Sequence, residues 1–115
     1  MNVLLLSNDL MTQSKVGDAC RVAGIEFKSA LTVERLLELI SATTVVVLDL
    51  AMQNYDVAEA VSKLRSSAVP PRAILAFGPH VHEARLQAAS DAGCDAVFAR
   101  GQFFAQAATI LQRLA

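Results

Sequence analysis

One aspartate, Asp49, directly follows the apolar run Val45-Val46-Val47-Leu48. A carboxylate that emerges from a buried strand onto the edge of a sheet can attack a phosphoryl donor, or it can bind a hard cation. It can equally cap the loop before the next helix and have no chemical role. From its position alone, both interpretations of Asp49 stay open.

Polar residues also follow the other apolar runs of the chain. In an open parallel sheet the carboxyl ends of the strands meet at one edge, where sites form near the topological switch point. We therefore expect these residues to converge on Asp49 if the strand order is 2-1-3-4-5. They are Ser7-Asn8-Asp9, Gly78-Pro79-His80 and Arg100-Gly101.

The elements that must position these residues are visible in the hydrophobic pattern. Residues 3–6, 45–48 and 73–77 are continuously apolar, and residues 96–99 form a weaker run. Such short continuous runs are typical of parallel strands covered on both faces. Residues 25–27 alternate between apolar and polar types, which predicts an edge strand.

Between these runs the apolar residues repeat at i, i+3, i+4 and i+7, which predicts amphipathic helices. An alanine-rich segment over residues 81–92 predicts a helix with a weaker apolar stripe. The four clear stripes are Val16/Ala19/Cys20/Ala23, Val33/Leu36/Leu37/Ile40, Val57/Ala60/Val61/Leu64 and Phe104/Ala107/Ala108/Leu111.

Capping residues agree with this division into elements. Gly24 and Gly93 suit left-handed positions after helices, and Thr32 and Asp56 suit helix N-caps. Strand and helix thus alternate five times. The sequence predicts one α/β domain over residues 1–115, a doubly wound five-stranded parallel sheet of order 2-1-3-4-5 with five helices.

Composition excludes several classes of function. The chain has 115 residues, 54% of them hydrophobic, and a formal net charge of −1, which provides no basic surface for nucleic acid or anionic membranes. We find no signal peptide and no apolar stretch long enough to span a membrane. Cys20 and Cys94 have no metal-type spacing and suit buried thiols in a reducing compartment, so we expect a cytoplasmic location.

The order of elements and the run DLAMQNYD over residues 49–56 resemble the receiver domain of bacterial response regulators, over essentially the whole chain. In that family an aspartate ends the third strand, a methionine follows two or three positions later, and an aspartate precedes the third helix. Asp49, Met52 and Asp56 match these features. The family's Ala-Gly before the fifth strand is matched at residues 92–93.

The resemblance implies that Asp49 is a phosphoacceptor candidate whose donor would be a histidine kinase. It also implies a protein-binding surface made by the fourth helix, the fifth strand and the fifth helix, where a homodimer could form. Phe103 and Phe104 begin the last helix; we expect one to face the core, while the other either packs as well or serves there as an exposed anchor.

The family's other functional residues are largely replaced. The acidic pair that holds Mg²⁺ after the first strand is here Ser7 and Asn8, and the hydroxyl residue after the fourth strand is Gly78. The switch aromatic of the fifth strand corresponds to Val97. The chain therefore resembles a degenerate receiver.

The conserved lysine and proline after the fifth strand of receivers also differ in this chain. They are Arg100 and Gly101 here, and without proline we expect a trans peptide bond between them. Arg100 keeps the positive charge and is a phosphate-contacting candidate, as is Gly78. Asp9 could replace a missing carboxylate if the loop shifts by one residue.

A weak Mg²⁺ site would then combine Asn8, Asp9, Asp49 and the carbonyl of Ala51. No other cofactor is implied by the sequence. His80 and His82 suit a solvated pair at the start of the fourth helix, because no further metal ligands are spaced around them.

These observations favour a signalling module that acts by protein–protein interaction, without ordinary Mg²⁺-dependent phosphorylation and without enzymatic turnover. The alternative is an active phosphoacceptor of a two-component phosphorelay, phosphorylated on Asp49 in an atypical site. A third interpretation is a small-ligand module at the same sheet edge, since one fold hosts many functions.

Overall fold

A computed structural model describes residues 1–114, so Ala115, the last residue of the predicted domain, lies outside the described residues. Five strands form one parallel sheet in the order β2-β1-β3-β4-β5, which confirms the predicted fold class and strand order. The strands are β1 (Asn2–Leu6), β2 (Glu26–Ala30), β3 (Thr44–Asp49), β4 (Ala73–Gly78) and β5 (Ala96–Ala99).

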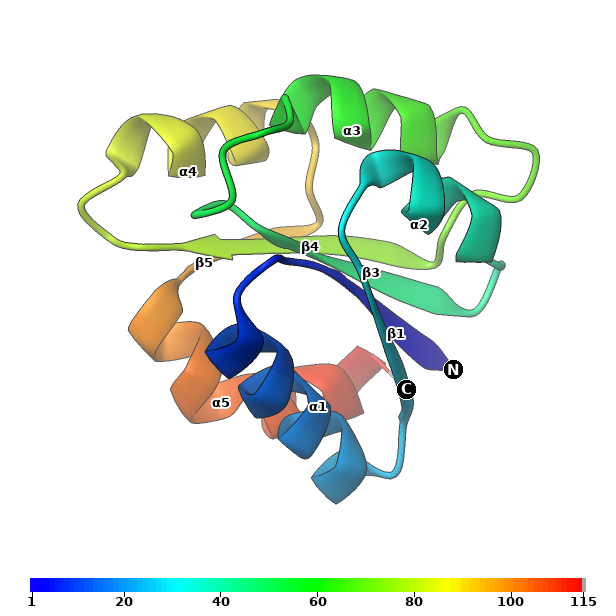
Figure 1. Cartoon of the computed structure of the whole chain (residues 1–115), viewed down its shortest axis with the longest axis vertical. Coiled ribbons are helices and arrows are strands. Elements are labelled where there is room, and N and C mark those ends of the chain that lie inside the picture. The colour runs from blue at the N-terminus through cyan, green and yellow to red at the C-terminus, as the bar shows by residue number, and fades with distance from the viewer. Residues whose placement is uncertain (115) are drawn as a thin grey trace.

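A helix follows each strand, and the helices divide between the two faces of the sheet. Helices α1 and α5 cover one face, whereas α2, α3 and α4 cover the other (Figure 1). This is the doubly wound arrangement that right-handed crossovers produce. The helices are α1 (Leu10–Ala23), α2 (Val33–Leu39), α3 (Val57–Arg65), α4 (Glu83–Asp91) and α5 (Arg100–Leu114).

The sheet separates two hydrophobic cores. Strands β3 and β4 are buried along their whole length, because successive side chains point to opposite faces and both faces are covered. The core under α2, α3 and α4 is mainly aliphatic. The core under α1 and α5 contains Phe77 and Phe103, whose rings stack with centroids 4.8 Å apart.

The predicted caps are confirmed. Thr32 and Asp56 precede α2 and α3, and each side chain accepts a hydrogen bond from the backbone N–H three residues later. Gly24 and Gly93 have φ angles of 72° and 96°, the left-handed region that ends a helix most easily with glycine.

Two element boundaries differ from the sequence-based expectation. Strand β2 extends to Ala30, past the short alternating segment 25–27, because its backbone continues to pair with β1. Helix α4 begins only at Glu83, and the side chain of Val81 is 70% exposed in the preceding loop. Helix α4 buries one residue, Ala89, which agrees with its thin apolar stripe.

The apolar stripe predicted for the last helix is confirmed at Ala107 and Leu111, which are buried, but its first buried residue is Phe103 and not Phe104. Helix α5 begins at Arg100, directly after β5, and in this phase it buries Phe103, whereas Phe104 is half-buried. Phe104 still contacts the aromatic core, with its centroid 5.4 Å from that of Phe77. It is therefore a packed residue, and not a freely exposed anchor.

Both cysteines are free thiols. Cys20 is buried and Cys94 is half-buried, and burial raises the pKa of each thiol to about 11. Within the described chain, no helix has the length and apolar character needed to cross a membrane.

Candidate functional site

The carboxyl edge of the sheet brings Ser7 and Asp49 together. Strands β1 and β3 are neighbours, and their register places Leu6 opposite Leu48. The next residue on each strand therefore reaches the edge at the same level. The hydroxyl Oγ of Ser7 donates a hydrogen bond of 2.7 Å to Oδ2 of Asp49.

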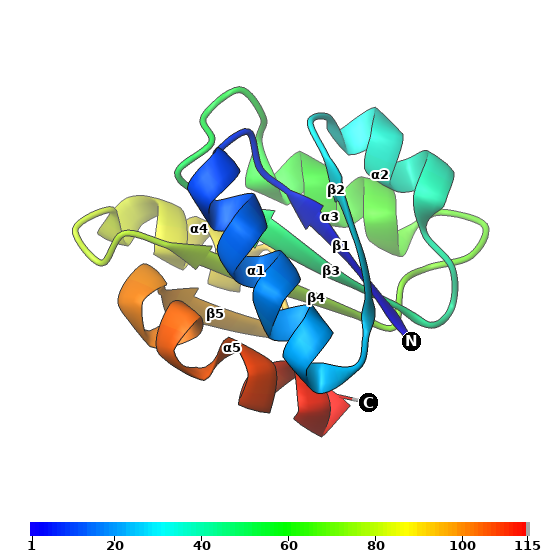
Figure 2. The same ribbon diagram turned by 60° about the horizontal axis from the view of Figure 1, so that its bottom comes forward.

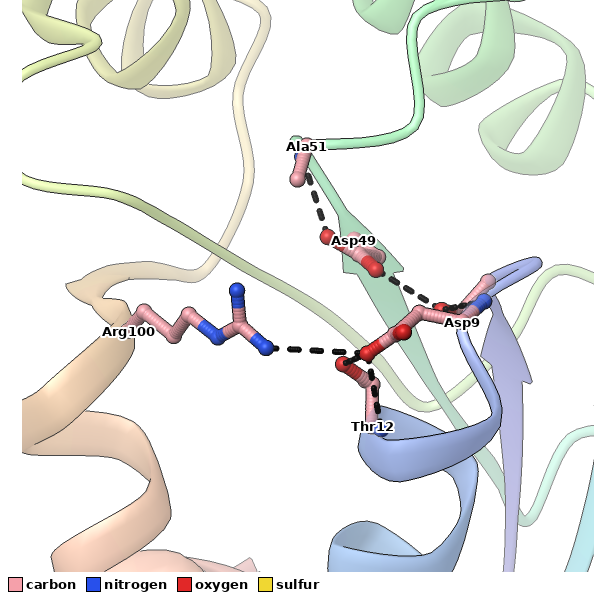
Figure 3. Close-up of polar contacts among 6 residues, drawn as sticks. Asp9, Thr12, Asp49, Ala51 and Arg100 are labelled. Carbon is pink, nitrogen blue, oxygen red and sulfur yellow. Dashed lines mark hydrogen bonds and ion pairs between the residues drawn. The ribbon is translucent and has the colours of Figure 1, made fainter.

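The carboxylate of Asp49 is enclosed. The residue is only 2% exposed, and its second oxygen, Oδ1, accepts a hydrogen bond of 2.9 Å from the backbone N–H of Ala51. Ser7 is also buried, and its Oγ accepts from the backbone N–H of Asp9 at 3.2 Å. Figure 3 shows this chain of contacts, in which both oxygens of Asp49 already have donors.

The loop after β3 closes over the neighbouring strand. Leu50 is fully buried, and its backbone N–H donates to the carbonyl of Phe77 on β4 at 2.8 Å. Leu50 also fills the space beside Gly78, because a Cβ added to Gly78 would lie 3.0 Å from the Cβ of Leu50. The glycine that replaces the receiver hydroxyl residue is thus matched by a leucine that occupies the space in front of it.

Asp9 is committed to the start of α1. As the N-cap residue, it accepts hydrogen bonds through Oδ2 from the backbone N–H of Thr12 at 3.0 Å and from the Thr12 hydroxyl at 2.6 Å. These two bonds, and then the nearby Arg100, lower the pKa of Asp9 below its usual value.

Arg100 is turned toward Asp9. Its Nη2 lies 3.6 Å from Oδ2 of Asp9, and the guanidinium lies over the ring of Phe104, 5.3 Å from the centroid. Figure 3 shows Arg100 pointing toward Asp9, with Asp49 above the Asp9 carboxylate in this view. The peptide bond after Arg100 is trans, as expected, since residues 1–114 contain no cis peptide bond.

The donor set that the resemblance implies for Mg²⁺ does not fit that ion in this arrangement. Mg²⁺ requires near-octahedral oxygen ligands that include carboxylates. Asp9 caps a helix, Asn8 is exposed, and Oδ2 of Asp49 is occupied by the Ser7 hydroxyl. Among the described residues, no group of three or more His, Cys, Asp or Glu side chains is placed to hold a metal.

Sequence reasoning missed two residues that secure this edge. Arg85 on α4 donates through Nε to the carbonyl of Leu50 at 2.6 Å and through Nη2 to the carbonyl of Met52 at 3.0 Å. The hydroxyl of Tyr55 donates to the backbone carbonyl of Asp49 at 3.0 Å, and the Arg85 guanidinium lies over the Tyr55 ring, 5.6 Å from its centroid. Burial raises the pKa of Tyr55.

The sequence near Arg85 does not indicate these contacts, because Arg85 is separated from the loop by more than thirty residues and an arginine on a helix is usually solvated.

The two histidines differ from the expected solvated pair in one respect. His80 is exposed, but His82 is half-buried at the N-cap of α4, and its Nδ1 is buried without a hydrogen-bond partner. Val97 is half-buried and packs on the aliphatic core, on the same side of the sheet as Gly78.

No protein-family model and no curated protein sequence matches the chain. Solved structures do match it over nearly their whole length. The BeF3-activated receiver domain of DrrB has a TM-score of 0.79 at 18% identity, covering 98% of this chain and 95% of that one. The CheY-like protein tadZ of Pseudomonas aeruginosa has a TM-score of 0.76 at 18% identity, covering 100% and 99%.

An atypical orphan response regulator, whose structure is described as revealing a phosphorylation-independent regulatory mechanism, has a TM-score of 0.73 at 12% identity, covering 99% of this chain and 94% of that one. Likeness at such low identity defines the fold and leaves the chemistry to the residues at the site. The chain therefore has the CheY-like fold of response regulator receiver domains.

Proposed function

We propose that this chain is a receiver-like signalling module that works by binding other proteins and is not phosphorylated in the ordinary Mg²⁺-dependent way. The observation that carries the proposal is the state of Asp49. Its carboxylate is buried, and each oxygen accepts a hydrogen bond, one of them from Ser7, the residue that stands where receivers have a metal-binding acid.

The chemistry of phosphoryl transfer supports this proposal. Such transfer depends on positioning and on neutralising the charge of the phosphoryl oxygens. At this edge the second carboxylate, Asp9, caps α1, the hydroxyl expected at residue 78 is missing, and Leu50 packs against Gly78. Of the nearby cations, Arg100 is engaged with Asp9, and Arg85 is engaged with the backbone carbonyls of Leu50 and Met52.

The structural neighbours agree that the fold admits both behaviours. One neighbour is a BeF3-activated receiver domain, and another is described as regulated independently of phosphorylation. The fold alone therefore cannot decide between them, and the residues around Asp49 favour the second. We further propose that the module has no catalytic turnover and that its free thiols belong in the reducing cytoplasm.

Phosphorylation of the purified chain tests this proposal directly. The protein is incubated with Mg²⁺ and acetyl phosphate, and its intact mass is measured, with the BeF3-activated DrrB receiver as a positive control and Asp49→Asn as the matched negative control. We expect no phosphoryl adduct on the wild-type chain. An adduct that Asp49→Asn abolishes would contradict the proposal.

The alternative function is an active phosphoacceptor in a two-component phosphorelay. It is favoured by one observation, that Asp49 ends β3 at the switch point of the sheet. In this case a histidine kinase would be the donor, Arg100 would leave Asp9 to offset the phosphoryl charge, and Asn8 or Asp9 would hold Mg²⁺ with Asp49 and the Ala51 carbonyl. The same mass measurement decides between the two functions.

A further inference from the structure

The solvent face of α1 carries four residues in a symmetric order of chemical types. Met11, Lys15, Asp18 and Val22 follow the spacing i, i+4, i+7 and i+11, which is the spacing of a coiled-coil seam. When the helix is read in the opposite direction, the apolar Met11 and Val22 exchange places, and so do the oppositely charged Lys15 and Asp18. We call these four residues the α1 seam.

The α1 seam is not part of the core of the molecule. Helix α1 packs on the sheet through Thr12, Val16 and Cys20, which lie on its other side. Met11 and Val22, the two apolar ends of the seam, are 62% and 68% exposed. Single exposed apolar residues are common on protein surfaces, and these two lie at matched positions of one helical seam, where an antiparallel partner helix would cover both.

A shallow groove lies beside the seam. Its volume is about 400 Å³, and Figure 2 shows the two helices that border it, α1 and α5, side by side on one face of the sheet. Small residues on both helices, Ala19, Ala105 and Ala108, leave room for another helix to approach closely. Phe104 contributes an apolar wall to the groove, and the ammonium of Lys15 lies 5.0 Å from its ring centroid.

We propose that the α1 seam is a two-fold interface with a second copy of this chain, in which the two α1 helices run antiparallel. A two-fold axis between residues 16 and 17 places Met11 of one copy opposite Val22 of the other. The same axis places Lys15 opposite Asp18, twice. Such an interface is isologous and closes at a dimer.

Charge complementarity selects this orientation. A parallel two-fold pairing would put Lys15 against Lys15 and Asp18 against Asp18, whereas the antiparallel pairing makes two attractive pairs. In the single chain Lys15 lies over the Phe104 ring, and Asp18 makes only an exposed ion pair. Asp18 pairs with Arg21 at 3.2 Å, but both side chains are largely exposed, and such pairs contribute little.

The surface expected from sequence for a homodimer, made by the last two helices, offers less. Among the described residues, the exposed large apolar side chains all lie outside α4, β5 and α5. The proposed interface extends the protein-binding part of the proposed function to a second copy of the chain. It does not depend on whether Asp49 is phosphorylated.

Charge reversal on the full chain tests the register. Sedimentation equilibrium should detect a wild-type dimer with a dissociation constant of roughly 10 µM, because the α1 seam offers four residues per copy, whereas a standard interface has about 20–30 residues per side. Lys15→Glu and Asp18→Lys should each weaken dimerisation by about tenfold. The double variant should recover it, because both intermolecular pairs are then simply reversed. Circular dichroism verifies that each variant is folded.

Disulfide trapping provides a second measurement. Residues 11 and 22 lie about 16 Å apart along one helix, so only an antiparallel neighbour can bring them within disulfide distance. A mixture of Met11→Cys and Val22→Cys chains should cross-link to each other far faster than either variant does alone. A chain that stays monomeric at millimolar concentration, or a double variant that does not recover, would overturn the interface. Phosphorylation of Asp49 would overturn only the proposed function.

Discussion

Two carboxylates at the same edge of the sheet, Asp49 and Asp9, have opposite environments. Asp49 is buried, and its oxygens accept from the Ser7 hydroxyl and the Ala51 backbone, both of them neutral groups. Asp9 is partly exposed, caps α1, and lies 3.6 Å from the Arg100 guanidinium. The cation that could assist phosphate chemistry is thus beside the carboxylate that serves a structural purpose.

The two carboxylates share one sheet edge but have different hydrogen-bond partners and different neighbouring charges. A phosphoacceptor needs access, a metal and a nearby positive charge. Around Asp49 the structure places two neutral hydrogen-bond donors and the packing of Leu50 against Gly78. Asp49 thus lies at the sheet edge where a receiver has its site, but it is buried and hydrogen-bonded to neutral groups.

The largest effect is expected when a carboxylate replaces the buried Ser7 beside Asp49. Ser7→Asp would bury a carboxylate against Asp49, and we expect a loss of about 3 kcal/mol in the free energy of unfolding at neutral pH. Denaturant unfolding measures this loss. Added Mg²⁺ should recover part of it, since two carboxylates then face one cation.

The pH dependence of Ser7→Asp has a defined sign. Mutual repulsion raises the pKa of the carboxylate pair in the folded state, so protonation favours folding and the variant should regain stability as the pH falls from about 7 to about 4. Asn8→Asp is the matched control, because it adds the same charge at an exposed neighbour and should change little. Equal losses of unfolding free energy in Ser7→Asp and Asn8→Asp would contradict the description of Asp49 as enclosed.

Restoring the receiver hydroxyl at residue 78 is expected to cost less. Gly78→Thr would force a Cβ to 3.0 Å from the Cβ of Leu50, and overpacking of this kind costs about 2 kcal/mol. The same substitution at Gly101, where no atom lies within 4 Å of the added Cβ, is the control. Combining Gly78→Thr with Leu50→Ala should cost less than the sum of the two single losses, as double-mutant unfolding experiments would reveal.

Removing the hydroxyl of Ser7 should have a moderate effect. Ser7→Ala takes one donor from the buried carboxylate of Asp49, and we expect a loss of about 1.5 kcal/mol. Ser29→Ala, on the exposed side of β2, is the control and should be near neutral. A Ser7→Ala variant as stable as the control in urea unfolding would mean that Asp49 is not held by this bond.

The smallest effects are expected at the partly exposed pair of Asp9 and Arg100. Hydrogen bonds from Thr12 lower the pKa of Asp9 in the folded state, so its carboxylate stabilises the protein at neutral pH, and this contribution disappears as the pH falls below about 4. The stability difference between wild type and Asp9→Ala should therefore shrink on acidification. Asp9→Asn keeps the cap and should lose less, and Arg100→Ala should be close to neutral in the same titration.

Local pattern predicted most of the fold. The continuous apolar runs of β3 and β4 and the caps at Thr32, Asp56, Gly24 and Gly93 depend on nearest neighbours along the chain, and all are as expected. Which phenylalanine of α5 faces the core was harder to predict, because Phe103 and Phe104 are adjacent and equally apolar. The assembled structure buries Phe103 and leaves Phe104 half-buried.

By itself, the sequence determined the α/β class and the place of Asp49 after a buried strand, because apolar periodicity and capping are local properties. The strand order 2-1-3-4-5 was an expectation that the pairing of the assembled sheet confirmed. The tertiary structure decided what surrounds Asp49. The Ser7 hydrogen bond follows from the register of β1 against β3, the Leu50 packing from the neighbouring strand β4, and the Arg85 contacts from the docking of α4. These partners are distant along the chain, so their distances exist only once the sheet and helices are assembled.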